Sequence, residues 1–249
     1  MNMIAEEQER QSDSPHVELI TRGITAIDGS TIRPAECQWH MVVVKHSGSM
    51  QLFVVGPLTT TGVVTFTKGA EILWIKFKLG SFMPQLPAAG VLDVEAALRG
   101  ASSQSFWLNG SAWQFPDYEN ADTFIHRLVR SDVLARDPVV SAALADHPPE
   151  MSPRSVRDRF VRATGLTHSR IRQVERAKRA AARLRQGQSI LDTVDAEGYF
   201  DQPHLTRSLK QWVGYTPAQL VRMSAPVCQF IQDGEPAPGY HMGVLENIR

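Results

Sequence analysis

One short segment of the chain carries polar side chains of the types and spacing that read DNA bases. It is "GYFDQPHLTRSLKQWVGYTP", residues 198–217. Asp201 is a good N-cap, and Leu205, Leu209 and Trp212 recur at the steps that form the buried stripe of a helix. The polar residues that remain on the outer face are Gln202, His204, Thr206, Arg207 and Lys210. Because glutamine and arginine can bond adenine and guanine edges in the major groove, this helix is a candidate for reading DNA.

The residues before this helix predict that it is the second half of a helix-turn-helix. The segment "SILDTVDAEG", residues 189–198, begins at a serine N-cap and ends at Gly198, which permits a left-handed turn between two helices. In a helix-turn-helix the second helix enters the major groove. Two helices joined at a glycine are also common on solvated surfaces, so this pattern alone leaves both interpretations open.

More helices are predicted upstream of this pair. "SPRSVRDRFVRATG" begins at Ser152, with proline next, and stops at Gly165. A long basic helix is predicted over 168–187, where apolar residues recur at three- and four-residue steps. A shorter helix is expected over 138–147. The C-terminal third is therefore predicted to be almost all helical.

Charge is divided unevenly along the chain. The formal net charge is zero, with 26 basic and 26 acidic residues. Residues 150–223 hold 14 Lys or Arg and 7 Asp or Glu, which leaves 12 and 19 for the rest. A basic third joined to an acidic remainder is typical of a protein in which one part meets a polyanion. Solvated helix faces would give the same count.

The N-terminal half is predicted to be rich in β-strands. Runs of Val, Ile, Phe and Thr are separated by turn-forming residues, which favours a small antiparallel sandwich or barrel. These runs are residues 36–46, 50–56, 61–67 and 71–80. Helical periodicity then predicts helices over 91–100 and 119–135, with a loop between them.

The C-terminal part strongly resembles the transcription regulators of the AraC/XylS type. The likeness covers about residues 138–223 and rests mainly on Gly198 to Gln202, His204, Arg207, Lys210 and Gly214 to Pro217. It implies two helix-turn-helix units, joined by one long helix, that bind successive major-groove segments on one side of DNA. By this resemblance "SPRSVRDRF" is the first recognition helix, "QPHLTRSLK" is the second, and residues 168–186 form the bridge.

The resemblance implies a set of DNA-binding residues. They are Arg154, Ser155, Arg157, Asp158, Gln202, His204, Thr206, Arg207 and Lys210. Asp158 departs from the family, in which arginine is common there, and a carboxylate is repelled by phosphates although it can accept a bond from cytosine. Pro203 occupies a position that is often polar in the family. In the helix before the turn, Thr193 and Val194 stand where the family usually has an apolar residue followed by alanine.

The predicted organisation combines the strand and helix patterns with the resemblance. The fold class is α+β: a small antiparallel β-barrel or sandwich with following helices, then an all-α domain with two helix-turn-helix units. Residues 1–15 are expected to be a disordered leader, 16–135 a cupin-like sensor or dimerisation domain, 136–223 the DNA-binding domain, and 224–249 a tail. The resemblance implies promoter DNA as the partner, no cofactor and no enzymatic activity. It leaves RNA polymerase, a small-molecule effector inside the sheet, and a second copy of the chain as further partners.

A metal-dependent cupin-type enzyme or a ligand-binding module is the alternative. Cys37, His40 and His46 are residue types that bind zinc or copper. Their spacing matches no known metal site, so a packed strand is the favoured interpretation and no metal is predicted. The sequence has no phosphate-binding or nucleophile motif that would indicate another enzyme class.

The composition predicts a globular protein of the cytoplasm. Hydrophobic residues make up 43% of the chain. No segment approaches the roughly 18 consecutive apolar residues of a membrane helix. The N-terminus lacks the basic start and apolar run of a secretory signal. Cys37 and Cys228 lie far apart, which argues against a disulfide framework.

Overall fold

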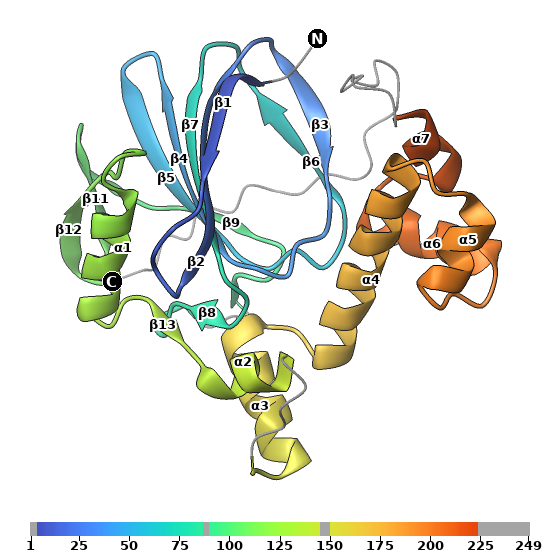
Figure 1. The fold of residues 1–249 in the computed structure, drawn as a ribbon. Helices are drawn as coiled ribbons and strands as arrows, with labels where there is room; N and C mark the ends of the chain where they lie inside the picture. Colours follow the sequence, from blue (N-terminus) through green and yellow to red (C-terminus); the bar gives the residue numbers. More distant parts are fainter. Residues whose placement is uncertain (1–3, 87–89, 145–149, 224–249) are drawn as a thin grey trace.

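A six-stranded antiparallel sheet forms the centre of the N-terminal part (Figure 1). The computed structural model describes residues 4–86, 90–144 and 150–223. In order across the sheet, the strands are β1 (Ile4–Arg10), β2 (Val17–Thr25), β7 (Glu71–Phe77), β4 (His40–His46), β5 (Ser49–Val55) and β9 (Glu95–Ala97).

Smaller sheets surround this one. A ribbon of two strands, β3 (Gly29–Arg33) and β6 (Gly62–Phe66), lies on the side away from α1 (Figure 1). The other sheets are formed by β10 (Gly100–Ser102), β11 (Ser105–Leu108) and β12 (Ser111–Gln114), and by β8 (Ser81–Phe82) with β13 (Ala135–Arg136). The β-rich prediction is confirmed, but among the described residues the strand pairs form separate sheets and do not close into a barrel.

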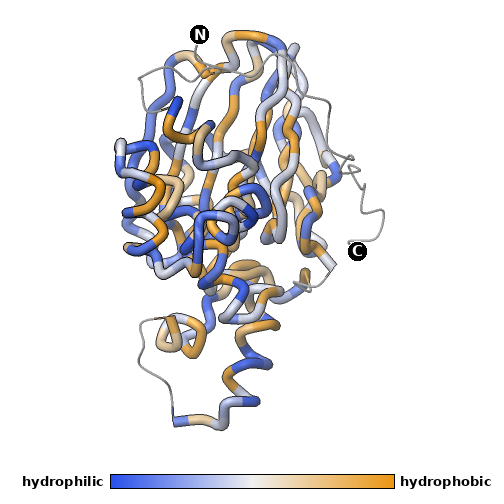
Figure 2. The backbone as a smooth tube through the Cα atoms, turned by 90° about the vertical axis from the view of Figure 1, so that its right-hand side faces the viewer, coloured by the Kyte–Doolittle hydropathy of each residue, from blue (hydrophilic) through white to orange (hydrophobic). Residues whose placement is uncertain are grey.

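The main core lies on one face of the large sheet. Met41, Ile75 and Phe77 are fully buried there and pack with helix α1 (Ala121–Arg130), which contributes Ile125 and Leu128. Figure 2 shows hydrophobic and hydrophilic residues alternating along the strands, as expected where only one face of a strand is fully buried. The opposite face of the sheet is turned toward the β3–β6 ribbon (Figure 1).

Several N-terminal predictions are wrong. Residues 4–10, expected in a disordered leader, form β1, which pairs with β2. Residues 91–100 do not form a helix: β9 and the start of β10 lie there, because β9 adds to the edge of β5. The expected loop after residue 100 is a three-stranded sheet, whose β11–β12 turn has positive φ angles of 50° and 72° at Asn109 and Gly110.

The predicted C-terminal helices are confirmed. They are α2 (Pro138–Leu144), α3 (Pro153–Thr164), α4 (His168–Arg185), α5 (Ile190–Ala196) and α6 (Gln202–Trp212), and α7 (Pro217–Arg222) follows them. The caps predicted at Ser152, Ser189 and Asp201 each accept a hydrogen bond from a backbone amide three residues later, which satisfies an exposed helix donor. The predicted end of the 138–147 helix and the 224–249 tail lie outside the described residues.

The two parts of the protein share a contact surface. Ala35 and Cys37, which precede β4, are fully buried in the core of the helical part. The Ala35 amide donates to the Trp212 carbonyl at 2.8 Å, and the Thr61 amide donates to the Gln211 carbonyl at 3.4 Å. The β-rich part thus packs against α4 and the C-terminal end of α6, beside which the β3–β6 ribbon lies in Figure 1.

Candidate nucleic-acid interface

The turn between α5 and α6 is held by specific contacts. Gly198 has a φ of +66°, the left-handed conformation predicted for it. The Tyr199 hydroxyl lies 3.0 Å from the Ser208 hydroxyl, and the Arg176 guanidinium of α4 stacks 4.3 Å from the Tyr199 ring centroid. The aromatic ring and the cation together fix the angle at which α6 leaves the turn.

Helix α6 presents three polar side chains that have no bonding partner among the described residues. Gln202, Arg207 and Lys210 are exposed, and their side chains make no hydrogen bond or ion pair with any described residue. The other two predicted residues have intramolecular partners: the His204 ring packs edge-on against Tyr199, and the Thr206 hydroxyl donates to the Gln202 carbonyl at 2.9 Å. The helix can therefore offer an amide, a guanidinium and an ammonium group to DNA.

Helix α3 presents a cluster of mixed charge. Arg154, Arg157 and Asp158 are exposed on one surface, and Asp158 lies 3.9 Å and 3.8 Å from the Nε atoms of the two arginines. Ser155 is half-buried, and its amide donates to the Ser152 hydroxyl at the N-cap. The carboxylate reduces the positive charge that α3 can offer to a phosphate.

The long helix α4 joins the two units, as the resemblance implied. Its buried stripe includes Ile171, Val174 and Leu184. Glu197, which is almost fully buried at the end of α5, accepts bonds from Arg179 and Arg183 at 3.1 Å and 2.7 Å. These two arginines of α4 therefore position the second unit, in addition to any attraction they exert on DNA.

The departures of Thr193 and Val194 fit the packing. Both side chains are buried, and the Thr193 hydroxyl donates to the Ser189 carbonyl at 2.8 Å. A buried hydroxyl with a backbone acceptor carries little desolvation penalty. The α5–α6 pair keeps its geometry despite the polar residue.

Phe200 is a surface residue that sequence reasoning missed. Its side chain is 90% exposed, immediately before α6. A large exposed apolar side chain beside a polar helix end is unusual in a solvated surface. The signal was present in the sequence, since Phe200 lies in the turn and outside the predicted buried stripe.

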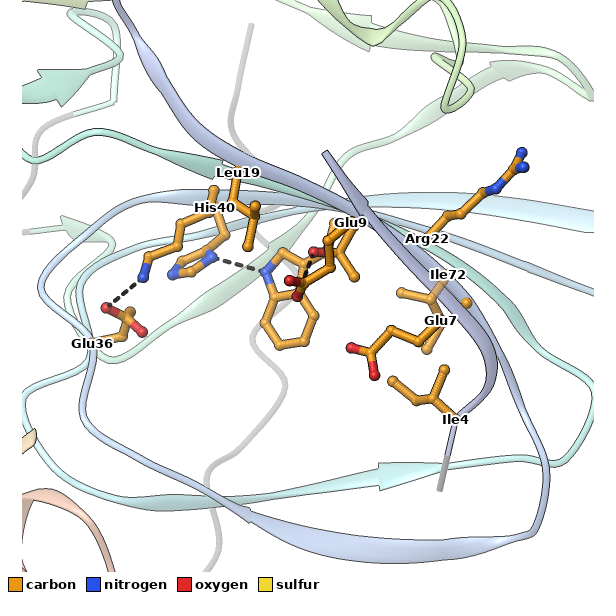
Figure 3. A pocket seen from close by; sticks show the side chains of 12 residues that line it. Ile4, Glu7, Glu9, Leu19, Arg22, Glu36, His40 and Ile72 are labelled. Atoms are coloured by element: carbon orange, nitrogen blue, oxygen red, sulfur yellow. Dashed lines mark hydrogen bonds and ion pairs between the residues drawn. The ribbon is translucent and has the colours of Figure 1, made fainter. Parts of the chain in front are cut away.

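A cavity of about 210 Å³ lies on the face of the large sheet opposite the main core (Figure 3). Ile72 and Trp74 from β7 and Leu19 from β2 provide apolar walls, and Glu36 and His40 lie at one end. The Trp74 indole donates to His40 Nδ1 at 2.8 Å. Burial lowers the pKa of His40 to about 4, so its ring is neutral at pH 7.

The three residues considered for a metal site do not come together. Cys37 is buried against the helices, where burial raises the pKa of its thiol to about 12. His40 bonds Trp74, and His46 lies at the far end of β4 beside the Ser47 hydroxyl. In the described ranges, no three His, Cys, Asp or Glu side chains gather closely enough to hold a metal ion.

Nor does any helix in residues 4–86, 90–144 and 150–223 combine the length and apolar character needed to cross a bilayer.

Comparison with known proteins agrees with the helical geometry. The family model described as a helix-turn-helix domain matches residues 150–223, which contain α3 to α7. No curated protein and no solved structure matches the chain significantly. The matched domain belongs to DNA-binding regulators and not to enzymes. The match and the two capped helices joined by α4 show that residues 150–223 form a helix-turn-helix domain, which supports a role in DNA binding and transcription regulation.

Proposed function

We propose that the protein recognises a specific promoter sequence through α3 and α6, and that a small molecule bound in the N-terminal part controls this recognition. The observation that carries the proposal is the surface of α6, where Gln202, Arg207 and Lys210 are exposed and have no partner among the described residues. A helix held at a fixed angle with free amide and guanidinium groups suits direct readout of bases. Cytoplasmic location follows from this role.

The roles of the candidate residues differ in this proposal. Gln202 and Arg207 contact base edges, whereas Lys210 contacts phosphate. On α3, Arg154 and Arg157 contact bases or phosphates of the neighbouring groove segment. The other four candidates contribute through shape and through the placement of these groups, and each has an intramolecular contact; they are His204, Thr206, Ser155 and Asp158.

The experiment that tests specific recognition begins with selection of a binding site from random DNA. Arg207→Ala should then weaken binding to the selected site by about 1–3 kcal/mol and relax preference at one position. Lys210→Ala should weaken binding to all sequences alike and flatten the salt dependence. Arg99→Ala, which removes an exposed arginine of the N-terminal part, is the matched control and should change neither property. Equal loss on all sequences for Arg207→Ala would overturn the assignment.

Control by an effector rests on the cavity of the N-terminal part. It joins apolar walls to a few polar groups, which is the usual composition of a small-molecule site. A shift in melting temperature on adding a ligand, together with a change in DNA affinity, would support this part of the proposal. Contact with RNA polymerase and pairing of two copies rest on the family resemblance alone.

A further inference from the structure

The cavity has more carboxylates than available cations. Glu7 and Glu9 of β1 line it, are exposed, and form no ion pair with any described residue. The cation on the cavity wall, Lys76, is already shared between Glu18 at 3.0 Å and Glu36 at 3.6 Å. The Arg22 side chain points away from the other lining groups in Figure 3 and bonds Gln8. The cavity is therefore suited to a cationic ligand.

The cavity wall also offers a surface for a cation. The Trp74 side chain is 36% exposed, and its indole N–H is fixed by His40. Because His40 Nδ1 accepts that bond, Nε2 carries the proton of the neutral ring. The Nε2 atom forms no hydrogen bond with another described residue, and the His40 residue is only 5% exposed. An ammonium group over Trp74 would gain a cation–π interaction beside the carboxylates.

Glu36 connects this cavity to the DNA-binding domain. Its carboxylate lines the cavity, and the Lys178 ammonium of α4 donates to it at 2.5 Å. Burial opposes ionisation, but the attraction of Lys178 and Lys76 lowers the pKa of Glu36 below its ordinary value, so it is charged. One carboxylate thus belongs to the cavity wall and to the surface between the two parts.

The reactivity of the Cys37 thiol indicates whether the contact surface between the β-rich part and α4 is closed. It follows Glu36 directly, is fully buried, and packs in the core formed by α4 and its neighbours. A thiol in this position can react with a reagent only when the β-rich part and α4 separate.

We propose that the cavity binds a small molecule with a cationic amine on an apolar body, and that this amine competes with Lys178 for the Glu36 carboxylate and loosens the contact with α4. This rests on the proposed function in one respect, that the cavity is the effector site. Loss of the Glu36 bond leaves the Lys178 ammonium with Glu175, 3.3 Å away on α4 itself, so the ion pair that joins α4 to the β-rich part is lost and docking of α4 weakens.

The test measures the rate at which N-ethylmaleimide labels Cys37 in the full chain carrying Cys228→Ser, which leaves Cys37 as its single cysteine. The probes are cyclohexylamine, cyclohexanol and cyclohexanecarboxylate, which share one apolar body and differ in charge. Cyclohexylamine should raise the labelling rate by about tenfold with saturation, and the other two should not. Equal effects of all three probes, or no effect of the amine, would overturn the proposal.

Variants locate the effect at the shared carboxylate. Lys178→Met should label fast without any probe and respond no further to the amine, whereas Lys178→Arg keeps the ion pair and should behave like the parent chain. Slow labelling of a folded Lys178→Met variant would contradict the role of this bond. If Lys178→Met does not fold, the three-probe comparison still decides the matter. Labelling requires no DNA, so a failure of DNA binding and a failure of this coupling are separate results.

Discussion

Gly214 should be far less tolerant of a side chain than Gly198, although both end a helix in a left-handed conformation. Their φ angles are +88° and +66°. A Cβ atom at Gly198 would meet nothing within 4 Å, whereas one at Gly214 would lie 2.5 Å from Cγ2 of Ile32 in the β-rich part. Gly198→Ala therefore carries only the backbone penalty, and Gly214→Ala adds a collision between the two parts.

The magnitudes follow from these two terms. The left-handed conformation costs an alanine about 1 kcal/mol, which lowers the melting temperature by about 3 °C for Gly198→Ala. Overpacking adds about 2 kcal/mol, so Gly214→Ala should melt about 9 °C below the parent protein. The assay is thermal unfolding followed by tryptophan fluorescence.

A double-mutant cycle tests the cause. Ile32→Ala removes the colliding methyl group, so the pair Ile32→Ala/Gly214→Ala should recover about 2 kcal/mol relative to the sum of the single changes. Ile32→Ala combined with Gly198→Ala should be additive. Equal destabilisation by the two glycine changes, or an additive Gly214 pair, would refute the packing of the β-rich part against the end of α6.

Three further predictions concern charge, pH and the exposed turn. Asp158→Asn should remove the carboxylate beside Arg154 and Arg157 and raise affinity for random DNA about fivefold at low salt. The salt dependence of binding, measured by fluorescence anisotropy, should become steeper, and an unchanged dependence would show that α3 does not contact the phosphates. His40 takes up a proton at a pKa of about 4 when folded and near 6.5 when unfolded, so its contribution to stability is present above pH 6.5 and is lost as pH falls toward 4. Between these pH values the parent protein should lose on the order of 3 kcal/mol more than His40→Gln in urea unfolding, and parallel losses would contradict this. Phe200→Ala should move the melting temperature by less than about 2 °C yet weaken binding to the selected DNA about fivefold in gel-shift assays; unchanged affinity would remove Phe200 from the interface.

The helical part could be predicted because its signals are local. Ser152, Ser189 and Asp201 each cap a helix within three residues of themselves, and periodicity along α6 separates Leu205 from exposed Arg207. Such signals depend on neighbours in sequence and not on the rest of the fold. The family resemblance added the pairing of two units, which no single helix reveals.

The β-rich part was harder because strand pairing is decided by distant residues. Residues 91–100 have helical periodicity, but residues 95–97 form a strand where β5 offers an unpaired edge. The Asn109–Gly110 pair is a local hairpin signal and forms the turn between β11 and β12, where a loop was expected.

Details of the site also escaped prediction when they joined distant segments. Glu36 and Lys178 are 142 positions apart, and no pattern in either segment indicates that they meet. The inward fold of the His204 ring onto Tyr199 likewise depends on the turn geometry, so periodicity alone placed His204 among the outward residues.

The burial of Ala35 and Cys37 among the helices means that the DNA-binding module is incomplete without a piece of its neighbour. A fragment beginning at residue 136 would expose the apolar surface of α4 that these two side chains cover, and such surfaces promote self-association. Exchanging the N-terminal half for that of another regulator would then require a matching 33–37 segment. Substitutions in that segment are therefore limited by its packing among the helices, whereas the cavity residues of β2 and β7 lie outside this core.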